Sequence, residues 1–193
     1  MRDHAYHVLL LSSSATFHAV LKSLLPSSDY PVVCSAYSAQ AAKELQREQQ
    51  FDLVFVDTPL PDASGKLFAL EACRRKGAVV LLFSKQELFE EINDEVIKQG
   101  IFTLAKPTSK TILAQALRWM RSAREGLRLS ENKTHQVEQK IEDIRIINRA
   151  KWLLISELKM NEADAHHYIE KQAMDRCLTK RQIAEDIIRM YSL

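Results

Sequence analysis

The first 107 residues alternate between two hydrophobic periods. Helical spacing, such as that of Leu67, Leu70 and Cys73, separates short apolar runs at 6–11, 32–36, 53–57, 78–83 and 101–104. Such runs, rich in Val, Leu and Phe, are typical of strands that are buried on both faces of a sheet. The alternation predicts an α/β fold: a doubly wound, five-stranded parallel sheet with helices on both faces.

The pattern changes after Pro107. No further Pro follows it, no Gly follows Gly126, and strand-like runs stop, so the remaining chain is predicted to be helical. We expect a domain at 1–120, a long connector helix at 121–140 and a three-helix module at 141–193.

Capping signals mark the helix boundaries in this last module. Asn161 is a candidate N-cap of its second helix. Thr179 and Gln182 have the spacing of a capping box and predict the start of the third helix.

Composition and charge limit the function classes. The chain is 46% hydrophobic and 27% charged, which excludes fibrous and largely disordered proteins. The apolar run Val8 to Leu11 is far shorter than the roughly 20 residues of a membrane span, so we expect a cytoplasmic protein that does not contact membranes. Residues 1–107 hold 11 basic and 13 acidic residues, whereas 108–193 hold 16 and 12. The C-terminal part is therefore the basic part.

The cysteines give no sign of a disulfide or a metal site. Cys34, Cys73 and Cys177 lie far apart and form no CxxC pair. We expect three buried thiols.

Polar residues follow four of the five predicted strands. They are Ser12 and Ser13, Asp57, Ser84, and Lys106. Because parallel strands present their carboxyl ends at one edge of a sheet, we expect these side chains to lie together.

Together with Pro61, Gly65 and Pro107, these residues resemble the receiver domain of bacterial two-component response regulators. The resemblance extends from residue 5 to about 120. It implies a flavodoxin-like fold in which Asp57 accepts a phosphoryl group, Lys106 neutralises its charge and the Ser84 hydroxyl bonds a phosphate oxygen.

One departure from the receiver pattern affects the expected chemistry. Receivers bind Mg²⁺ with an acidic pair after the first strand, where this chain has Ser12 and Ser13. We therefore expect no cofactor, doubtful Mg²⁺ binding and the loss of ordinary phosphorylation. Two alternatives stay open: Asp57 pairs with Lys106 only to stabilise the fold, or the protein is an ordinary phosphorylation-controlled regulator.

The connector helix carries a heptad pattern. Val137, Ile141 and Ile144 are its large apolar positions, and Asn148 occupies a position that can fix register. The pattern predicts a parallel coiled-coil homodimer. The alternative is an amphipathic helix that packs on the chain's own domains.

The C-terminal module resembles the ANTAR domain, the RNA-binding module of transcription antitermination regulators, over 141–193. The matching residues include Ala150-Lys151, Leu153-Leu154, Asn161 to Ala165, Ala173-Met174 and Ile183-Ala184. The family has Gly where this chain has Trp152. An indole there either packs in the core or changes the approach of RNA.

The ANTAR resemblance implies a surface of cations that contacts RNA phosphates. The candidates are Lys151, Arg176, Lys180, Arg181 and Arg149.

The sequence thus predicts a non-enzymatic regulator that binds a hairpin in an mRNA leader and prevents termination. A sensor kinase or a ligand-sensing protein is the expected signalling partner. The rival prediction is a protein-interaction regulator whose receiver-like domain docks such a sensor. A DNA-binding regulator is less favoured because no recognition helix stands out.

Overall fold

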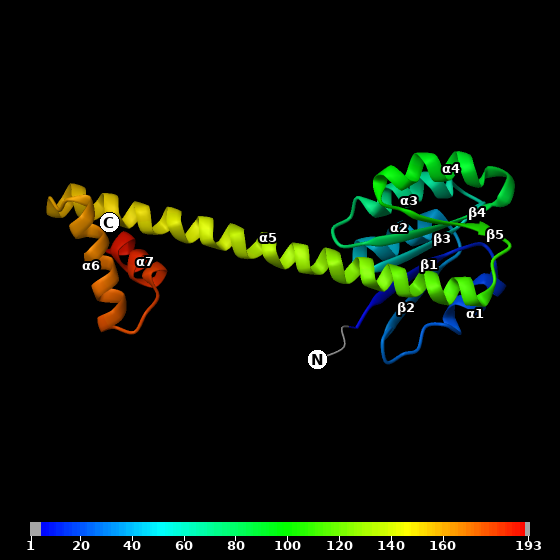
Figure 1. The fold of residues 1–193 in the computed structure, drawn as a ribbon, viewed down its shortest axis with the longest axis horizontal. Coiled ribbons are helices and arrows are strands. Elements are labelled where there is room, and N and C mark those ends of the chain that lie inside the picture. The colour runs from blue at the N-terminus through cyan, green and yellow to red at the C-terminus, as the bar shows by residue number, and fades with distance from the viewer. Residues whose placement is uncertain (1–4, 192–193) are drawn as a thin grey trace. The chain divides into compact units, whose positions relative to one another are not determined.

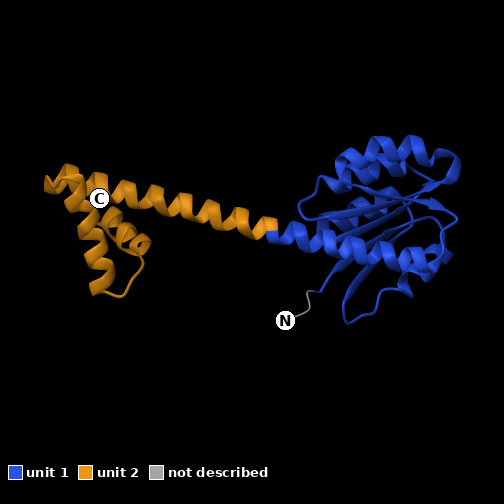
Figure 2. Cartoon of the chain, in the orientation of Figure 1, with its two compact units in different colours: residues 1–129 blue, residues 130–193 orange. Residues whose placement is uncertain are grey.

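The computed structural model describes residues 5–191, and the chain divides into two compact units, 1–129 and 130–193 (Figure 2). The first unit contains a five-stranded, all-parallel sheet with the order β2-β1-β3-β4-β5. Its strands are β1 His7–Leu11, β2 Val32–Ala36, β3 Leu53–Asp57, β4 Val79–Lys85 and β5 Phe102–Lys106. The predicted doubly wound α/β fold is confirmed.

Helices connect the strands and continue beyond them (Figure 1). Short 3-10 turns at Gln86–Leu88 and Ile97–Gln99 flank the fourth helix. The helices are α1 Ala15–Lys22, α2 Ala39–Glu48, α3 Gly65–Cys73, α4 Phe89–Val96, α5 Lys110–Leu158, α6 Glu162–Asp175 and α7 Lys180–Tyr191. Helix α5 therefore contains the predicted connector and the first helix of the predicted three-helix module.

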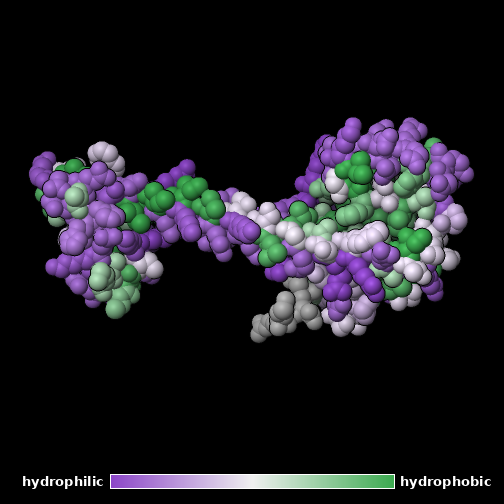
Figure 3. Space-filling view, in the orientation of Figure 1, coloured by the Kyte–Doolittle hydropathy of each residue, from purple (hydrophilic) through white to green (hydrophobic). Residues whose placement is uncertain are grey.

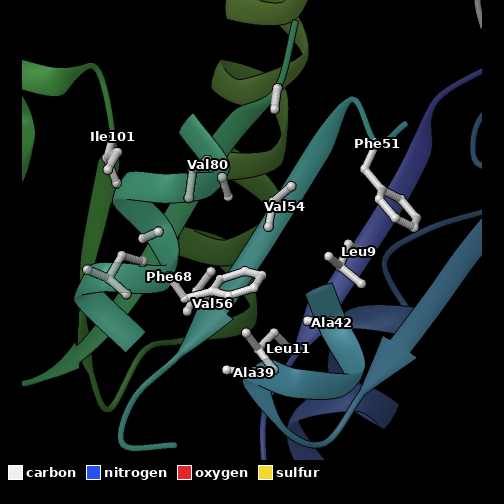
Figure 4. Close-up of a cluster of buried hydrophobic side chains, with 14 of the residues drawn as sticks. Leu9, Leu11, Ala39, Ala42, Phe51, Val54, Val56, Phe68, Val80 and Ile101 are labelled. Atoms are coloured by element: carbon white, nitrogen blue, oxygen red, sulfur yellow. The ribbon is translucent and has the colours of Figure 1, made fainter. Parts of the chain in front are cut away.

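The sheet is buried on both faces because alternate side chains of each strand point to opposite sides. On one face, Leu9, Val54 and Val80 pack with residues of α2, α3 and α4 (Figure 4). On the other face, Leu10 and Phe55 pack with residues of α1 and α5. The continuous apolar runs of the sequence follow from this double burial.

One helical face differs from the sequence prediction. Leu67 begins the helical apolar spacing of this segment, but its side chain is 58% exposed, whereas Phe68 and Ala69 are buried. Gly65 gives the physical reason: a Cβ there would lie 2.3 Å from Thr58 Cγ2. This close packing fixes how α3 is rotated against the sheet.

The expectation of three buried thiols is wrong. Cys34 and Cys73 are only partly buried, and Cys177 is exposed. Cys34 lies on β2, an edge strand that has a neighbour on one side only. Cys177 follows α6 in a left-handed conformation, with φ of 52°, and this turn directs the chain toward α7.

The second unit has a small core of its own. Ala150 and Leu154 of α5 pack with Ile169 of α6 and with Ile183 and Ile187 of α7.

Both predicted caps of this unit are present. Asn161 Oδ1 accepts a hydrogen bond from the Asp164 backbone N–H at 2.8 Å. The Gln182 N–H donates to Thr179 Oγ1 at 3.2 Å, and the Thr179 N–H donates to Gln182 Oε1 at 3.0 Å. The capping box is therefore confirmed.

Helix α5 forms ion pairs with loops of the first unit through charged residues that the sequence analysis did not single out. Arg124 Nε donates to Asp52 Oδ1 at 2.8 Å, and both side chains are largely buried. Arg121 pairs with Asp29 at 3.1 Å. These contacts tie α5 to the loops that precede β2 and β3. Across residues 5–191, no helix combines the length and hydropathy of a membrane span.

Candidate functional site

The predicted site at the carboxyl edge of the sheet is a closed polar cluster around Asp57. This aspartate is the last residue of β3 and is 7% exposed. Ser12 Oγ donates to Asp57 Oδ2 at 2.6 Å, and Lys106 Nζ donates to Asp57 Oδ1 at 2.5 Å. Lys106 also donates to the Thr58 carbonyl. Each carboxylate oxygen of Asp57 therefore has a donor from another strand end or its loop.

Ser12 is itself held on two sides. Its Oγ accepts a hydrogen bond from the Ser14 N–H at 2.9 Å, and its carbonyl lies 2.9 Å from His18 Nε2. Because a carbonyl only accepts, His18 donates from Nε2. His18 is buried on α1, and its Nδ1 has no hydrogen-bond partner among the described residues. The sequence analysis missed His18 because only the fold brings α1 against the Ser12 backbone.

The two remaining predicted site residues make no hydrogen bond to Asp57. Ser84 is buried at the end of β4, but its Oγ has no hydrogen-bond partner among residues 5–191. Ser13 is exposed, and the hydrogen-bond donors to the Asp57 carboxylate are Ser12 and Lys106. The structure therefore joins Ser12, Asp57 and Lys106 by hydrogen bonds.

The donor set of this cluster does not fit Mg²⁺. A hard divalent cation requires several oxygen ligands, preferably carboxylates. Asp57 supplies one carboxylate, and its two oxygens already accept from a hydroxyl and an ammonium group. Within residues 5–191, no three His, Cys, Asp or Glu side chains are grouped as metal ligands.

The predicted dimer seam lies on an exposed part of α5. Val137, Ile141 and Ile144 are each about half exposed and do not pack into either core. Figure 3 shows hydrophobic surface along α5. The seam side chains are thus apolar and exposed within their own unit.

Two of the predicted RNA-binding cations lie in the first turn of α7, and both are paired. Lys180 Nζ lies 2.5 Å from Glu170 Oε1, and this hydrogen bond holds the pKa of Glu170 below its usual value. Arg181 contacts Glu185 at 2.8 Å and Asp143 at 2.9 Å. Hydrogen bonds to Glu185 and then Asp143 raise the pKa of Arg181.

The other three predicted cations are distributed over α5 and the end of α6. Lys151 pairs with Glu162 at 3.0 Å, and Arg176 pairs with Asp186 at 3.1 Å. Arg149 is exposed and has no ion-pair partner among the described residues. Most of these pairs are solvent-exposed, and such pairs contribute about 0–1 kcal/mol each to the free energy of unfolding. Their cations can therefore exchange a carboxylate for another anion at little cost.

Two family models match the chain. The response regulator receiver domain matches residues 8–118, and the ANTAR domain matches residues 135–188. The first covers the sheet and the Asp57 cluster, and the second covers the C-terminal helices. The chain therefore belongs to the receiver–ANTAR class of transcription regulators, as the sequence resemblance predicted.

Individual proteins agree with this assignment. The chain is 30% identical over 184 residues to the transcriptional regulatory protein PdtaR of Mycobacterium tuberculosis, strains CDC 1551 and H37Rv, covering 94% of this chain and 88% of the relative.

Solved structures support the receiver fold. The signal receiver domain of a LuxO repressor protein from Vibrio parahaemolyticus has a TM-score of 0.58 at 18% identity, covering 66% of this chain and 98% of that one. A CheY-like receiver from Methanospirillum hungatei has a TM-score of 0.55 at 18% identity, covering 63% and 98%.

Proposed function

We propose that the protein binds a hairpin in the leader of a nascent mRNA through residues 141–193 and prevents formation of the terminator. The observation that carries this proposal is the ANTAR match over a unit whose cations lie in exchangeable surface pairs. The protein acts in the cytoplasm as a regulator and not as an enzyme.

Lys180 and Arg181 are the strongest phosphate-binding candidates. They lie in the first turn of α7, where unpaired backbone N–H groups and the helix dipole also favour an anion. When an RNA phosphate replaces Glu170 as the partner of Lys180, or Asp143 as the partner of Arg181, counterions leave the RNA. This release of counterions drives binding. Lys151, Arg176 and Arg149 extend the cationic surface.

A homodimer fits the exposed seam. In the proposal, residues 121–140 form the connector, and Val137, Ile141 and Ile144 pair with the same residues of a second copy. Two linked modules then engage paired hairpins, and the second contact becomes intramolecular, which increases affinity without new interactions.

The receiver unit, residues 1–120 in the proposal, regulates the module without ordinary phosphorylation. Its acceptor-like carboxylate is already neutralised by Lys106 and bonded by Ser12. A sensor kinase or a ligand-sensing protein is the proposed partner, acting by docking on this unit. Mg²⁺ is not required for that mode of action.

A mobility-shift experiment tests the RNA assignment. We expect the full chain to bind a leader hairpin more tightly than duplex DNA of equal length. Equal affinity for both, or none for the hairpin, contradicts the proposal and favours the protein-interaction alternative.

Intact-mass measurement after treatment with a small phosphodonor and Mg²⁺ tests the regulatory part. We expect Asp57 to stay largely unmodified. Stoichiometric modification that Asp57→Asn abolishes would instead indicate a phosphorylation-controlled regulator.

A further inference from the structure

Trp152 is exposed although its helix builds the core of the second unit. Its exposed fraction is 70%, whereas Ala150 and Leu154, two residues away on either side, are buried. Of the two sequence-based expectations for this indole, packing in the core is wrong. Within residues 5–191, Trp152 makes no hydrogen bond, ion pair or ring contact. A large aromatic surface is thus presented to solvent.

The exposed neighbours of Trp152 on the helix surface are polar and cationic. Residues three, four and seven positions apart share one face of an α-helix. This spacing places four exposed residues beside Trp152, and we call the five together the Trp152 stripe: Arg145, Asn148, Arg149, Trp152 and Ser156. The stripe lies on the side of α5 opposite Leu154, and therefore away from the core.

The cations of the stripe are available to a ligand. Arg145 has a single long ion pair, 3.6 Å to Glu142, and both side chains are more than half exposed. Arg149 has no ion-pair partner among the described residues. An exposed indole flanked by cations one turn and two turns away is complementary to a polymer that carries flat bases on a phosphate backbone.

We propose that Trp152 stacks on an unpaired base of the hairpin loop, while Arg145 and Arg149 contact the phosphates that flank that base. This inference rests on the proposed RNA-binding function and assigns it a base-stacking residue.

The dimer seam is the competing use of the stripe. Val137, Ile141 and Ile144 precede Asn148 along one edge of the same helix, so a coiled coil that extends far enough would reach Trp152. The charges favour RNA at Trp152, because a parallel coiled coil that extended this far would place each arginine of the stripe near its own copy. The two uses make different predictions for the oligomeric state.

Intrinsic fluorescence isolates Trp152. The chain has two tryptophans, and the other, Trp119, lies in the first unit. In the full chain carrying Trp119→Phe, we expect a hairpin RNA to quench the remaining tryptophan in a saturable manner. The same hairpin with abasic loop positions should still bind but should quench little.

Affinity measurements complete the test. Base–aromatic stacking contributes enough that Trp152→Ala should weaken hairpin binding about tenfold or more. Trp152→Phe should retain most of the affinity, and Trp119→Ala, an aromatic loss of the same kind in the other unit, should change it little. Neither change at position 152 should alter the helical circular dichroism signal, because the side chain packs in no core.

Each other outcome overturns the inference in a distinguishable way. Tight hairpin binding without quenching, and unchanged in Trp152→Ala, removes the stacking role but leaves the proposed function standing. If sedimentation shows that the Trp152→Ala variant is a monomer and the wild type a dimer, the indole belongs to the dimer interface. If the wild-type protein has no affinity for the hairpin, both the proposed function and this inference are wrong.

Discussion

The Asp57 cluster of the receiver unit and the predicted RNA-binding cations of the C-terminal unit pair their charges in opposite ways. In the receiver unit, Asp57 is buried and both of its oxygens are bonded within the chain. In the C-terminal unit, the pairs of Lys180 and Arg181 lie at the surface, where solvent and salt screen them. A buried pair is costly to break, whereas a surface pair exchanges partners readily. In our proposal, the first therefore stabilises the fold and the second serves binding.

The largest expected effect tests whether the units are separate. Leu154→Ala removes one of the few large side chains of the small second core, so we expect a loss of about 2–5 kcal/mol in that unit's unfolding free energy. Urea unfolding followed by circular dichroism should then show the C-terminal helices melting first.

The matched control is Leu10→Ala, which makes the same change in the larger core of the first unit. It should destabilise the receiver unit and leave the other transition in place. If both variants shift one common transition equally, the division into independent units is wrong.

Breaking the Asp57–Lys106 pair is expected to lower the unfolding free energy of the receiver unit by a smaller amount. Lys106→Met leaves the Asp57 carboxylate without its cation, and we expect a loss of about 2 kcal/mol. This is less than for a fully buried pair, because the Lys106 side chain is 31% exposed. Adding Asp57→Asn should recover most of the loss. If the two substitutions change the unfolding free energy additively in chemical denaturation, Asp57 and Lys106 are not energetically coupled.

The contacts of α5 in the receiver unit permit a comparison of a buried with a surface pair. Arg124→Ala breaks the largely buried pair with Asp52 and should cost about 1–2 kcal/mol. Arg128→Ala breaks a more exposed pair within the helix, to Glu125, and should cost less than about 0.5 kcal/mol. Thermal unfolding of the two variants measures the difference. Equal shifts would indicate that burial does not determine the strength of these pairs.

The sequence predicted the parts of the fold that depend on local pattern. The β-strands, the Asn161 cap and the Thr179–Gln182 capping box follow from short-range periodicity and hydrogen bonding. The convergence of Ser12, Asp57 and Lys106 followed from the topology of a parallel sheet.

The missed features all depend on distant contacts. The rotation of α3 is set by Gly65 packing against Thr58, and the burial of His18 is set by the backbone of Ser12. The Arg124–Asp52 pair joins residues 72 positions apart. The exposure of Trp152 depends on which face of α5 the other helices cover, and a hydrophobic residue type alone does not reveal this.

The smallest expected effect concerns an exposed carboxylate of the receiver unit. Hydrogen bonds from the backbone N–H groups of Ala39 and then Gln40 lower the pKa of Asp62. Because the folded pKa lies below the unfolded one, this stabilisation is present above the unfolded pKa and is lost as pH falls through the folded pKa. Asp62→Asn should therefore lower the urea midpoint slightly at neutral pH and not in strong acid. A difference that persists in strong acid would mean that the charge is not responsible.

The central claim is that surface cations of the C-terminal unit contact RNA phosphates. The most direct test is hairpin affinity across a range of salt concentrations for the wild type and for Lys180→Ala/Arg181→Ala, with Arg74→Ala/Lys76→Ala as a control of equal charge on the receiver unit. We predict weaker binding by the first variant and a slope of log affinity against log salt that is shallower by roughly 0.7–0.9 per lost contact. The control should match the wild type. Identical slopes for all three proteins would contradict the claim.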